Sequence, residues 1–310
     1  MTIRSLTNST VSNNQKKYTK LATKYTDYPY VTEYVVVAAG GGHPGSSGSN
    51  SAEGSGGGGG GGYRSSVVGE LSGTDYPAED ALLLTKGTYS ITVGVGGTGQ
   101  GGSSKFAGNL IVSTGGGSGR ARNSGGSTGG SGGGGFNSTV NPDISAYNGI
   151  NGQGTHGWEG SGSTGGAGGG AGGASLGGTV NASRTSAVPG LTTRILGSGY
   201  AKTLAAGGAG TNGNGSDGTD GTGNGANGGH FNNGGGTEKS YPSRSGGNGV
   251  VFFKVPYAAE VSFSAGTVDG PYWIKDDNTS VQTSNRPGPE YLYHAYRVTS
   301  SITVGIDEAV

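Results

Sequence analysis

Residues 34–42 read YVVVAAGGG, and residues 56–62 are seven consecutive glycines. The stretch from residue 40 to residue 249 holds all but four of the 74 glycines of this 310-residue chain. An average protein has roughly 7% glycine, so this stretch does not supply a conventional core of large side chains. It is either a flexible linker or a structure whose backbone packing requires glycine.

Strand-like segments interrupt the glycine runs and argue against a linker. Residues 34–39 (YVVVAA) are apolar, residues 89–95 (YSITVGV) alternate with a period of two, and residues 103–112 (SSKFAGNLIV) form a further candidate strand. Residues 246–255 (GGNGVVFFKV) close the series. A tether has no use for such segments, so we expect an ordered scaffold.

The glycine runs predict an irregular glycine-rich fold of packed polyglycine-II helices, flanked by short β-strands and followed by a β-rich C-terminal segment. The related polyproline-II helix has no internal hydrogen bonds, so its backbone groups are available to neighbouring helices. Ordering a glycine costs about 0.5–1 kcal/mol more than ordering an alanine. Lateral hydrogen bonds, at about 0.5–1.5 kcal/mol each, would offset that cost.

The composition predicts three regions. Residues 1–33 are polar and then tyrosine-rich, and are interpreted as an N-terminal attachment arm. Residues 34–255 form the predicted polyglycine-II sandwich with loop inserts. Residues 256–310 carry strand-like pieces such as GPYWIK and YLYHAYRV, and are predicted to be a β-rich C-terminal segment.

Composition also limits the kinds of partner that we expect. The chain has no cysteine and no net charge, which predicts no disulfide framework and no general attraction to nucleic acid. The polar N-terminus lacks the apolar region of a signal peptide, and the apolar run at 35–39 is too short to span a bilayer. We therefore expect synthesis in a cytoplasm and no membrane insertion.

Catalytic and metal-binding patterns are weak. The four histidines, His43, His156, His230 and His294, lie far apart in the sequence. We predict no enzyme, no cofactor and no metal site. Asp217 and Asp220 lie among glycines in a pattern loosely similar to calcium-binding repeats but lack the hydrophobic residue of such repeats, so ion binding there is left open.

Aromatic and histidine side chains occur on inserts between glycine runs. One interpretation is that they cover the ends of the glycine stack. The other is that they are exposed contact points, because Trp and Tyr are enriched at binding hot spots and rigid scaffolds commonly present binding loops. The candidate contact residues are Phe136, Tyr147, His156, Trp158, His230, Phe231 and Tyr241.

The succession of YVVVAAGGG, TYSITVGVGGTGQGG at 88–102, further glycine blocks and GGNGVVFFKV resembles the glycine-rich proteins of bacteriophage tails. It is particularly similar to the adhesin at the tip of the long tail fibre of T-even-like phages. The resemblance covers about residues 34–255. It implies a polyglycine-II sandwich whose loops bind an outer-membrane protein or surface polysaccharide of the bacterium, and a terminal segment that attaches to the fibre.

The resulting functional prediction is a structural virion protein of a phage tail or tail fibre that works as a receptor-binding module. Its predicted partners are other virion proteins and a bacterial surface receptor. The alternative is a purely structural fibre, collar or decoration protein whose loops contact other virion proteins. A non-viral surface-binding protein with packed glycine helices is disfavoured by the irregular inserts. Which end faces the particle stays open at this point.

Overall fold

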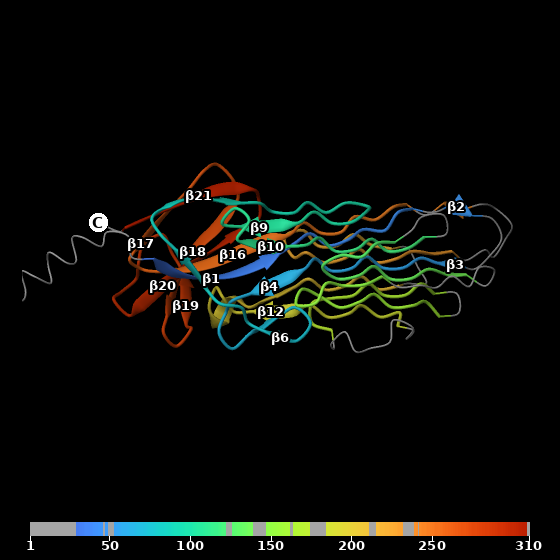
Figure 1. Cartoon of the computed structure of the whole chain (residues 1–310), viewed down its shortest axis with the longest axis horizontal. Coiled ribbons are helices and arrows are strands. Elements are labelled where there is room, and N and C mark those ends of the chain that lie inside the picture. The colour runs from blue at the N-terminus through green and yellow to red at the C-terminus, as the bar shows by residue number, and fades with distance from the viewer. Residues whose placement is uncertain are drawn as a thin grey trace, which may run out of the picture.

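The protein is elongated, with a β-sheet body at one end and long glycine-rich segments that run side by side to the other end (Figure 1). We call the strands at the first end and their connections the β body. We call the described parts of 38–62, 94–102, 113–190 and 205–249 the glycine shaft. The computed structural model describes residues 29–45, 47–48, 53–121, 126–138, 147–161, 164–173, 184–210, 215–231, 239–240 and 242–308.

Regular secondary structure in the described residues is almost entirely β-strand. The one helical element there is a 3-10 turn, η1 (Ser198–Tyr200). The short strands of the shaft are β2 (Ser47–Gly48), β3 (Glu53–Gly54), β11 (Asn137–Ser138), β14 (His230–Phe231) and β15 (Lys239–Ser240). The strands of the β body are β1 (Tyr30–Val37), β4 (Tyr63–Ser65), β5 (Leu71–Ser72), β6 (Tyr76–Pro77), β7 (Leu82–Leu84), β8 (Gly87–Ile91), β9 (Ser104–Phe106), β10 (Ile111–Ser113), β12 (Leu191–Thr193), β13 (Lys202–Leu204), β16 (Val250–Pro256), β17 (Ala259–Phe263), β18 (Val268–Lys275), β19 (Ser280–Gln282), β20 (Tyr291–Val298) and β21 (Ile302–Glu308).

The largest sheet joins strands from opposite ends of the described chain. Its order is β19-β18-β20-β16-β1-β4, with β7 also paired to β1. β1 and β16 are antiparallel, and Val36 lies opposite Val251. The strand predicted at 34–39 falls largely within β1, whose last four residues are all buried. Its continuous apolar sequence follows from burial on both faces of the sheet.

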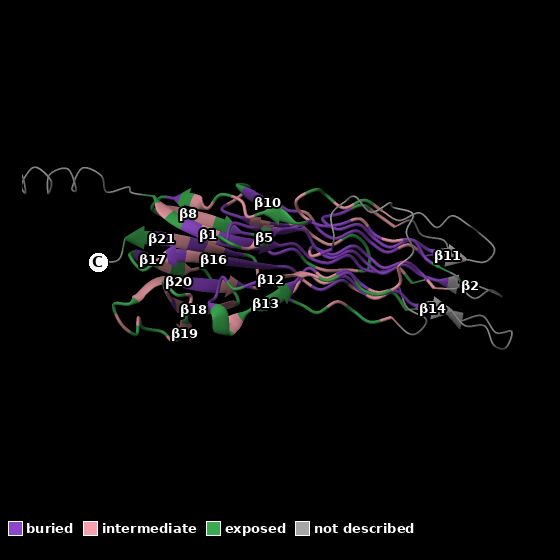
Figure 2. Ribbon diagram, turned by 90° about the horizontal axis from the view of Figure 1, so that it is seen from below, coloured by how far each residue is buried: buried purple, intermediate pink, exposed green. Residues whose placement is uncertain are grey.

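Each face of this sheet covers a hydrophobic core. On one face, Phe253 belongs to a cluster that includes Val304 of the smaller sheet β17-β21-β8. On the other face, Phe252 belongs to a cluster that includes Leu204 of β13. Alternate residues of β16 therefore enter different cores, as the period of two in a strand requires. Burial continues from the β body along the glycine shaft (Figure 2).

The shaft is held together by hydrogen bonds between backbone segments. Consecutive amides of residues 56–62 donate to three different neighbouring segments in turn, over 2.7 to 2.9 Å. Every third residue therefore faces the same neighbour. The acceptors are the carbonyls of Arg120, Gly117 and Thr114 for Gly56, Gly59 and Gly62, those of Gly166 and Gly169 for Gly57 and Gly60, and those of Ala226 and Gly223 for Gly58 and Gly61.

The predicted fold class of packed polyglycine-II helices is wrong. The described chain has its regular structure in antiparallel β-sheets, and its glycine-rich segments form no helix. The physical reason lies at the β body, where β1 leads directly into a glycine run and β16 directly follows one. The chain continues beyond them in an extended course, and its amides bond to other segments.

Two predicted strands have different bounds in the structure. The period of two at 89–95 corresponds to β8, which begins two residues earlier and ends at Ile91. The candidate strand at 103–112 is two strands, β9 and β10, paired antiparallel. Ala107 and Gly108 between them have positive φ angles of 51° and 72°, which reverse the chain.

The predicted division into arm, glycine-rich domain and C-terminal segment stays a prediction. Most of the arm, residues 1–28, lies outside the described residues. β16, which contains the predicted boundary at 255, pairs with both β1 and β20. Among the described residues no helix is long and apolar enough to cross a membrane.

Candidate functional site

Four of the predicted contact residues lie together along one part of the glycine shaft. The Gly157 amide donates to the Tyr147 carbonyl over 2.8 Å, and the Gly135 amide donates to the Trp158 carbonyl over 2.9 Å. These bonds place the segments of Phe136, Tyr147, His156 and Trp158 next to one another. We call these four residues the flank cluster.

The members of the flank cluster differ in exposure. The Phe136 side chain is only 4% exposed, so it packs within the shaft. Tyr147, His156 and Trp158 are half-buried. The Tyr147 ring lies against bare backbone, because a Cβ added at Gly126 would come within 2.4 Å of it. Three of the four side chains therefore keep a solvent-facing part that a partner could contact.

Trp158 presents an aromatic face beside a cation. The Arg184 guanidinium lies 5.7 Å from the Trp158 ring centroid, which is cation–π geometry. Arg184 is positioned by its own hydrogen bonds to the carbonyls of Ser186 and Ala187, each 3.1 Å long. The Trp158 Nε1–H is buried and has no hydrogen-bond partner among the described residues. Sequence reasoning missed Arg184, because it lies 26 residues away along the chain.

His156 is fixed by a backbone amide. Its Nδ1 accepts a hydrogen bond from the Gly149 N–H over 3.1 Å. This bond places the proton of the neutral ring on Nε2. Burial lowers the pKa of His156, so the neutral ring is favoured near neutral pH. The residue can thus offer one N–H donor to a partner.

Two of the other candidates lie in the small sheet that also contains β11, the strand directly after Phe136. His230 and Phe231 form β14, which pairs with β3 in the shaft near the end remote from the β body (Figure 2). Their backbone is described, but their side chains lie outside the described set. Tyr241 lies outside the described residues altogether. Asn137 and His230 both pair with Gly54, so the backbone places β14 two strands away from β11 and close to the Phe136 end of the flank cluster.

Asp217 and Asp220 brace the backbone of a neighbouring segment. The Asp217 Oδ1 accepts the Ser245 N–H over 2.8 Å, and the Asp220 Oδ1 accepts the Asn248 N–H over 3.0 Å. The described residues contain no group of three or more potential metal ligands. The two aspartates are three residues apart, and so are the amides of Ser245 and Asn248 that they bind. The spacing of the aspartates therefore has a structural explanation.

A buried polar cluster crosses the shaft and was missed by sequence reasoning. His43 is fully buried, and its Nε2 bonds to the Ser55 hydroxyl. The Ser55 Oγ donates to the Gly229 carbonyl over 2.7 Å and accepts the Gly229 N–H over 2.8 Å. Burial lowers the pKa of His43. The cluster joins His43 and Ser55 to Gly229, which lies 174 residues after Ser55, and no local sequence pattern indicates it.

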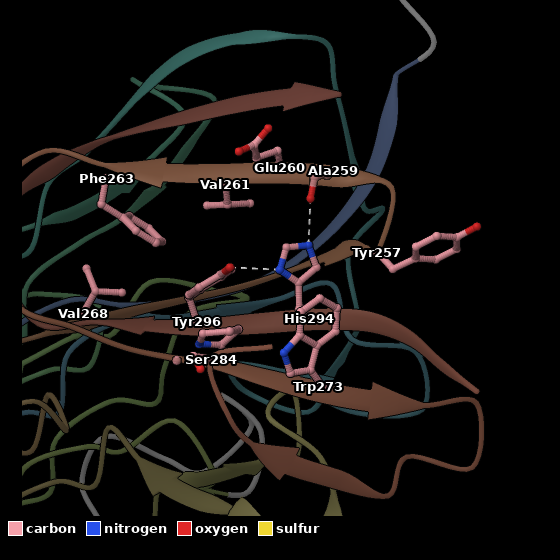
Figure 3. A pocket seen from close by; sticks show the side chains of 12 residues that line it. Tyr257, Ala259, Glu260, Val261, Phe263, Val268, Trp273, Ser284, His294 and Tyr296 are labelled. Atoms are coloured by element: carbon pink, nitrogen blue, oxygen red, sulfur yellow. Dashed lines mark hydrogen bonds between the residues drawn. The ribbon is translucent and has the colours of Figure 1, made fainter. Parts of the chain in front are cut away.

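The β body has an opening on one side that holds a cavity of about 510 Å³. Figure 3 shows Val261 and Phe263 of β17 pointing toward the rings of His294 and Tyr296, while the Glu260 carboxylate points away. Trp273 stacks on His294 with ring centroids 4.9 Å apart. The sequence signal for this lining is Trp273 in GPYWIK together with His294 and Tyr296, which alternate in YLYHAYRV.

A family model for a glycine-rich domain matches residues 19–256, and the chain belongs to that family. No curated protein and no solved structure matches the chain.

Proposed function

We propose that this protein is a receptor-binding module of a bacteriophage tail or tail fibre, in which a glycine shaft presents side chains to the surface of a bacterium. The observation that carries the proposal is the hydrogen bonding of residues 56–62, whose amides reach three neighbouring segments in rotation. Such cross-linking makes a long, stiff support from residues that have no side chains.

The absence of side chains is what lets the segments approach one another. A Cβ at Gly58 would lie 2.0 Å from the Gly41 carbonyl oxygen, and one at Gly61 would lie 1.9 Å from the Ala38 carbonyl oxygen. A stiff support suits a protein that must hold contact residues away from a particle. Rigid scaffolds that present variable loops are a recurrent design for binding.

The arrangement of the ends supports a direction for attachment. Both ends of the described chain, near Pro29 and Glu308, lie at the β body (Figure 1). In the proposal the β body faces the other virion proteins, and the shaft faces the host. The half-buried side chains of the flank cluster, with Arg184, are the first candidates for contact with an outer-membrane protein or a surface polysaccharide.

The test is binding of the purified full-length chain to cells from a panel of bacterial strains. Fluorescently labelled protein is measured by flow cytometry, and unlabelled protein is used to compete with phage adsorption on any strain that binds. We expect Trp158→Ala and His156→Ala to reduce binding at least tenfold. Leu110→Ala, an exposed side chain of the β body, serves as the matched control and should bind as wild type does.

The competing function is a purely structural fibre, collar or decoration protein. Under that alternative the labelled chain binds no strain in the panel and does not compete with adsorption. Binding that is equal for wild type, Trp158→Ala and His156→Ala would instead place the contact away from the flank cluster.

A further inference from the structure

The two sheets of the β body differ in width. The smaller sheet has three strands in the order β17-β21-β8. Its edge strand β17 lies over β20 of the larger sheet, because His294 bonds to the Ala259 carbonyl and Phe263 packs edge-on against Tyr296 with centroids 4.9 Å apart. β18, the next strand of the larger sheet, has no strand of the smaller sheet above it.

The uncovered face of β18 is the floor of the side opening. Val268, Pro271 and Trp273 line the cavity from this strand, and all three are half-buried. Strands in a sheet lie about 4.8 Å apart. One additional strand beside β17 would therefore lie over β18 and cover these side chains.

The backbone of β17 is suited to receive that strand. The Ser264 N–H bonds to the Thr303 carbonyl. The β17 residues whose backbone groups bond to β21 are therefore those at intervals of two from Ser264, which are Ser262 and Glu260. In an antiparallel pair the intervening residues direct both backbone groups the other way. The Ala259 carbonyl does so and meets His294. The N–H and C=O groups of Val261 and Phe263 therefore point to the free edge.

We propose that this edge binds an extended segment of a partner protein, which adds to β17 as a fourth strand and places an apolar side chain in the opening at every second residue. Main-chain hydrogen bonds supply affinity in such complexes, and pockets for alternate side chains supply specificity. The inference goes beyond the proposed function, because it concerns the β body and stands whether or not the shaft binds a receptor.

The polar groups of the opening favour this occupant over a small polar ligand. The Trp273 Nε1–H donates to the Thr283 carbonyl over 3.1 Å. Both nitrogens of His294 are bonded, one to the Ala259 carbonyl and one to the Tyr296 hydroxyl. These groups are satisfied within the protein, so the cavity offers a ligand mainly aromatic and aliphatic surface.

Charged side chains near the edge of β17 indicate a further property of the partner segment. Glu260 and Glu308 are exposed at the start of β17 and the end of β21, and neither takes part in an ion pair among the described residues. Both carboxylates lie at the same end of the sheet, because Ala259 pairs with Glu308, so a cationic residue at that end of the added segment would lie near them. The partner segment is therefore expected to be extended, alternately apolar and to carry Lys or Arg at that end.

The test uses the full-length chain and the peptide acetyl-Lys-Thr-Val-Thr-Val-Thr-Lys-amide. Its controls are the same peptide with Ala for Val and a version with methylated backbone amides. Calorimetry should show binding of the parent peptide, with at least tenfold weaker binding of both controls. In a Trp158→Phe background, which leaves Trp273 as the one tryptophan, binding should shift the tryptophan emission to the blue.

A matched pair of proline variants tests the edge itself. Val261→Pro removes an N–H that points to the free edge, so the chain should keep its Tm and lose peptide binding at least tenfold. Ser262→Pro removes an N–H that bonds to β21 and should lower the Tm. The proposal is overturned if the parent peptide does not bind, if methylated and parent peptides bind equally, or if Val261→Pro folds and binds as wild type does.

Discussion

His294 on β20 donates its Nε2–H to the carbonyl oxygen of Ala259 on β17, 3.0 Å away. A carbonyl only accepts, so this bond fixes the tautomer and leaves Nδ1 to accept the Tyr296 O–H over 2.9 Å. The imidazole therefore connects the two sheets of the β body in its neutral form. Protonation of Nδ1 would remove the acceptor that Tyr296 uses.

This geometry predicts a pH dependence of stability. Burial lowers the pKa of His294 to about 4, below the value of about 6.5 in an unfolded chain. The unfolded state then binds the proton more readily, so stability is lost as the pH falls from about 6.5 to about 4. The full difference corresponds to about 3 kcal/mol.

Urea unfolding at pH 7 and pH 5 measures this effect. His294→Gln should be less stable than wild type at pH 7 but lose less stability between the two pH values. Titration of carboxylates affects both proteins, so it cancels in the comparison. An identical pH dependence of wild type and variant would show that His294 does not cause it.

Close packing in the shaft predicts that Gly→Ala substitutions at different positions will differ sharply in their effect on stability. Gly58→Ala would place a Cβ 2.0 Å from the Gly41 carbonyl oxygen, and because that atom is backbone, whole segments would have to move. We expect a loss of about 3 kcal/mol or more, at or above the usual cost of overpacking.

Gly99→Ala is the matched control, because a Cβ there meets no atom within 4 Å. It should be neutral or stabilise by about 0.4–1 kcal/mol through the unfolded state. Thermal unfolding of both variants decides the matter. Equal Tm values would contradict the close approach of segments described for the shaft.

The cluster around Ser55 predicts a cost for removing one hydroxyl. Ser55→Ala leaves the buried Gly229 amide and the His43 Nε2 without a partner. Unsatisfied buried polar groups cost about 1–3 kcal/mol. Chemical denaturation should show a loss in this range for Ser55→Ala and almost none for Ser284→Ala, since Ser284 is exposed.

Asp220 allows a test of its role as a backbone acceptor. Asp220→Asn keeps an oxygen for the Asn248 N–H and should change stability little, whereas Asp220→Ala should cost about 0.5–1.5 kcal/mol. Thermal unfolding with and without millimolar calcium completes the test. A rise in Tm on adding calcium that Asp220→Asn abolishes would instead identify an ion site.

Sequence reasoning was most accurate for continuous apolar runs. The apolar run that forms the end of β1 and the run VVFF in β16 were predicted as strands, and their burial on both faces explains why the signal is strong. It was least accurate for the inserts. Phe136 and Trp158 look alike in sequence, each next to glycine runs, yet one is buried and the other half-buried. Their exposure depends on which segment lies beside them.

The sequence by itself determined that residues 40–249 carry too few large side chains for a conventional core, and that any order there must come from the backbone. Only the tertiary structure decided which carbonyl each amide meets. A glycine has no side chain to mark its partner, so the choice depends on the β strands that set the position of each segment. The same holds for the bond between His294 and Ala259, because it joins two sheets that no local pattern relates.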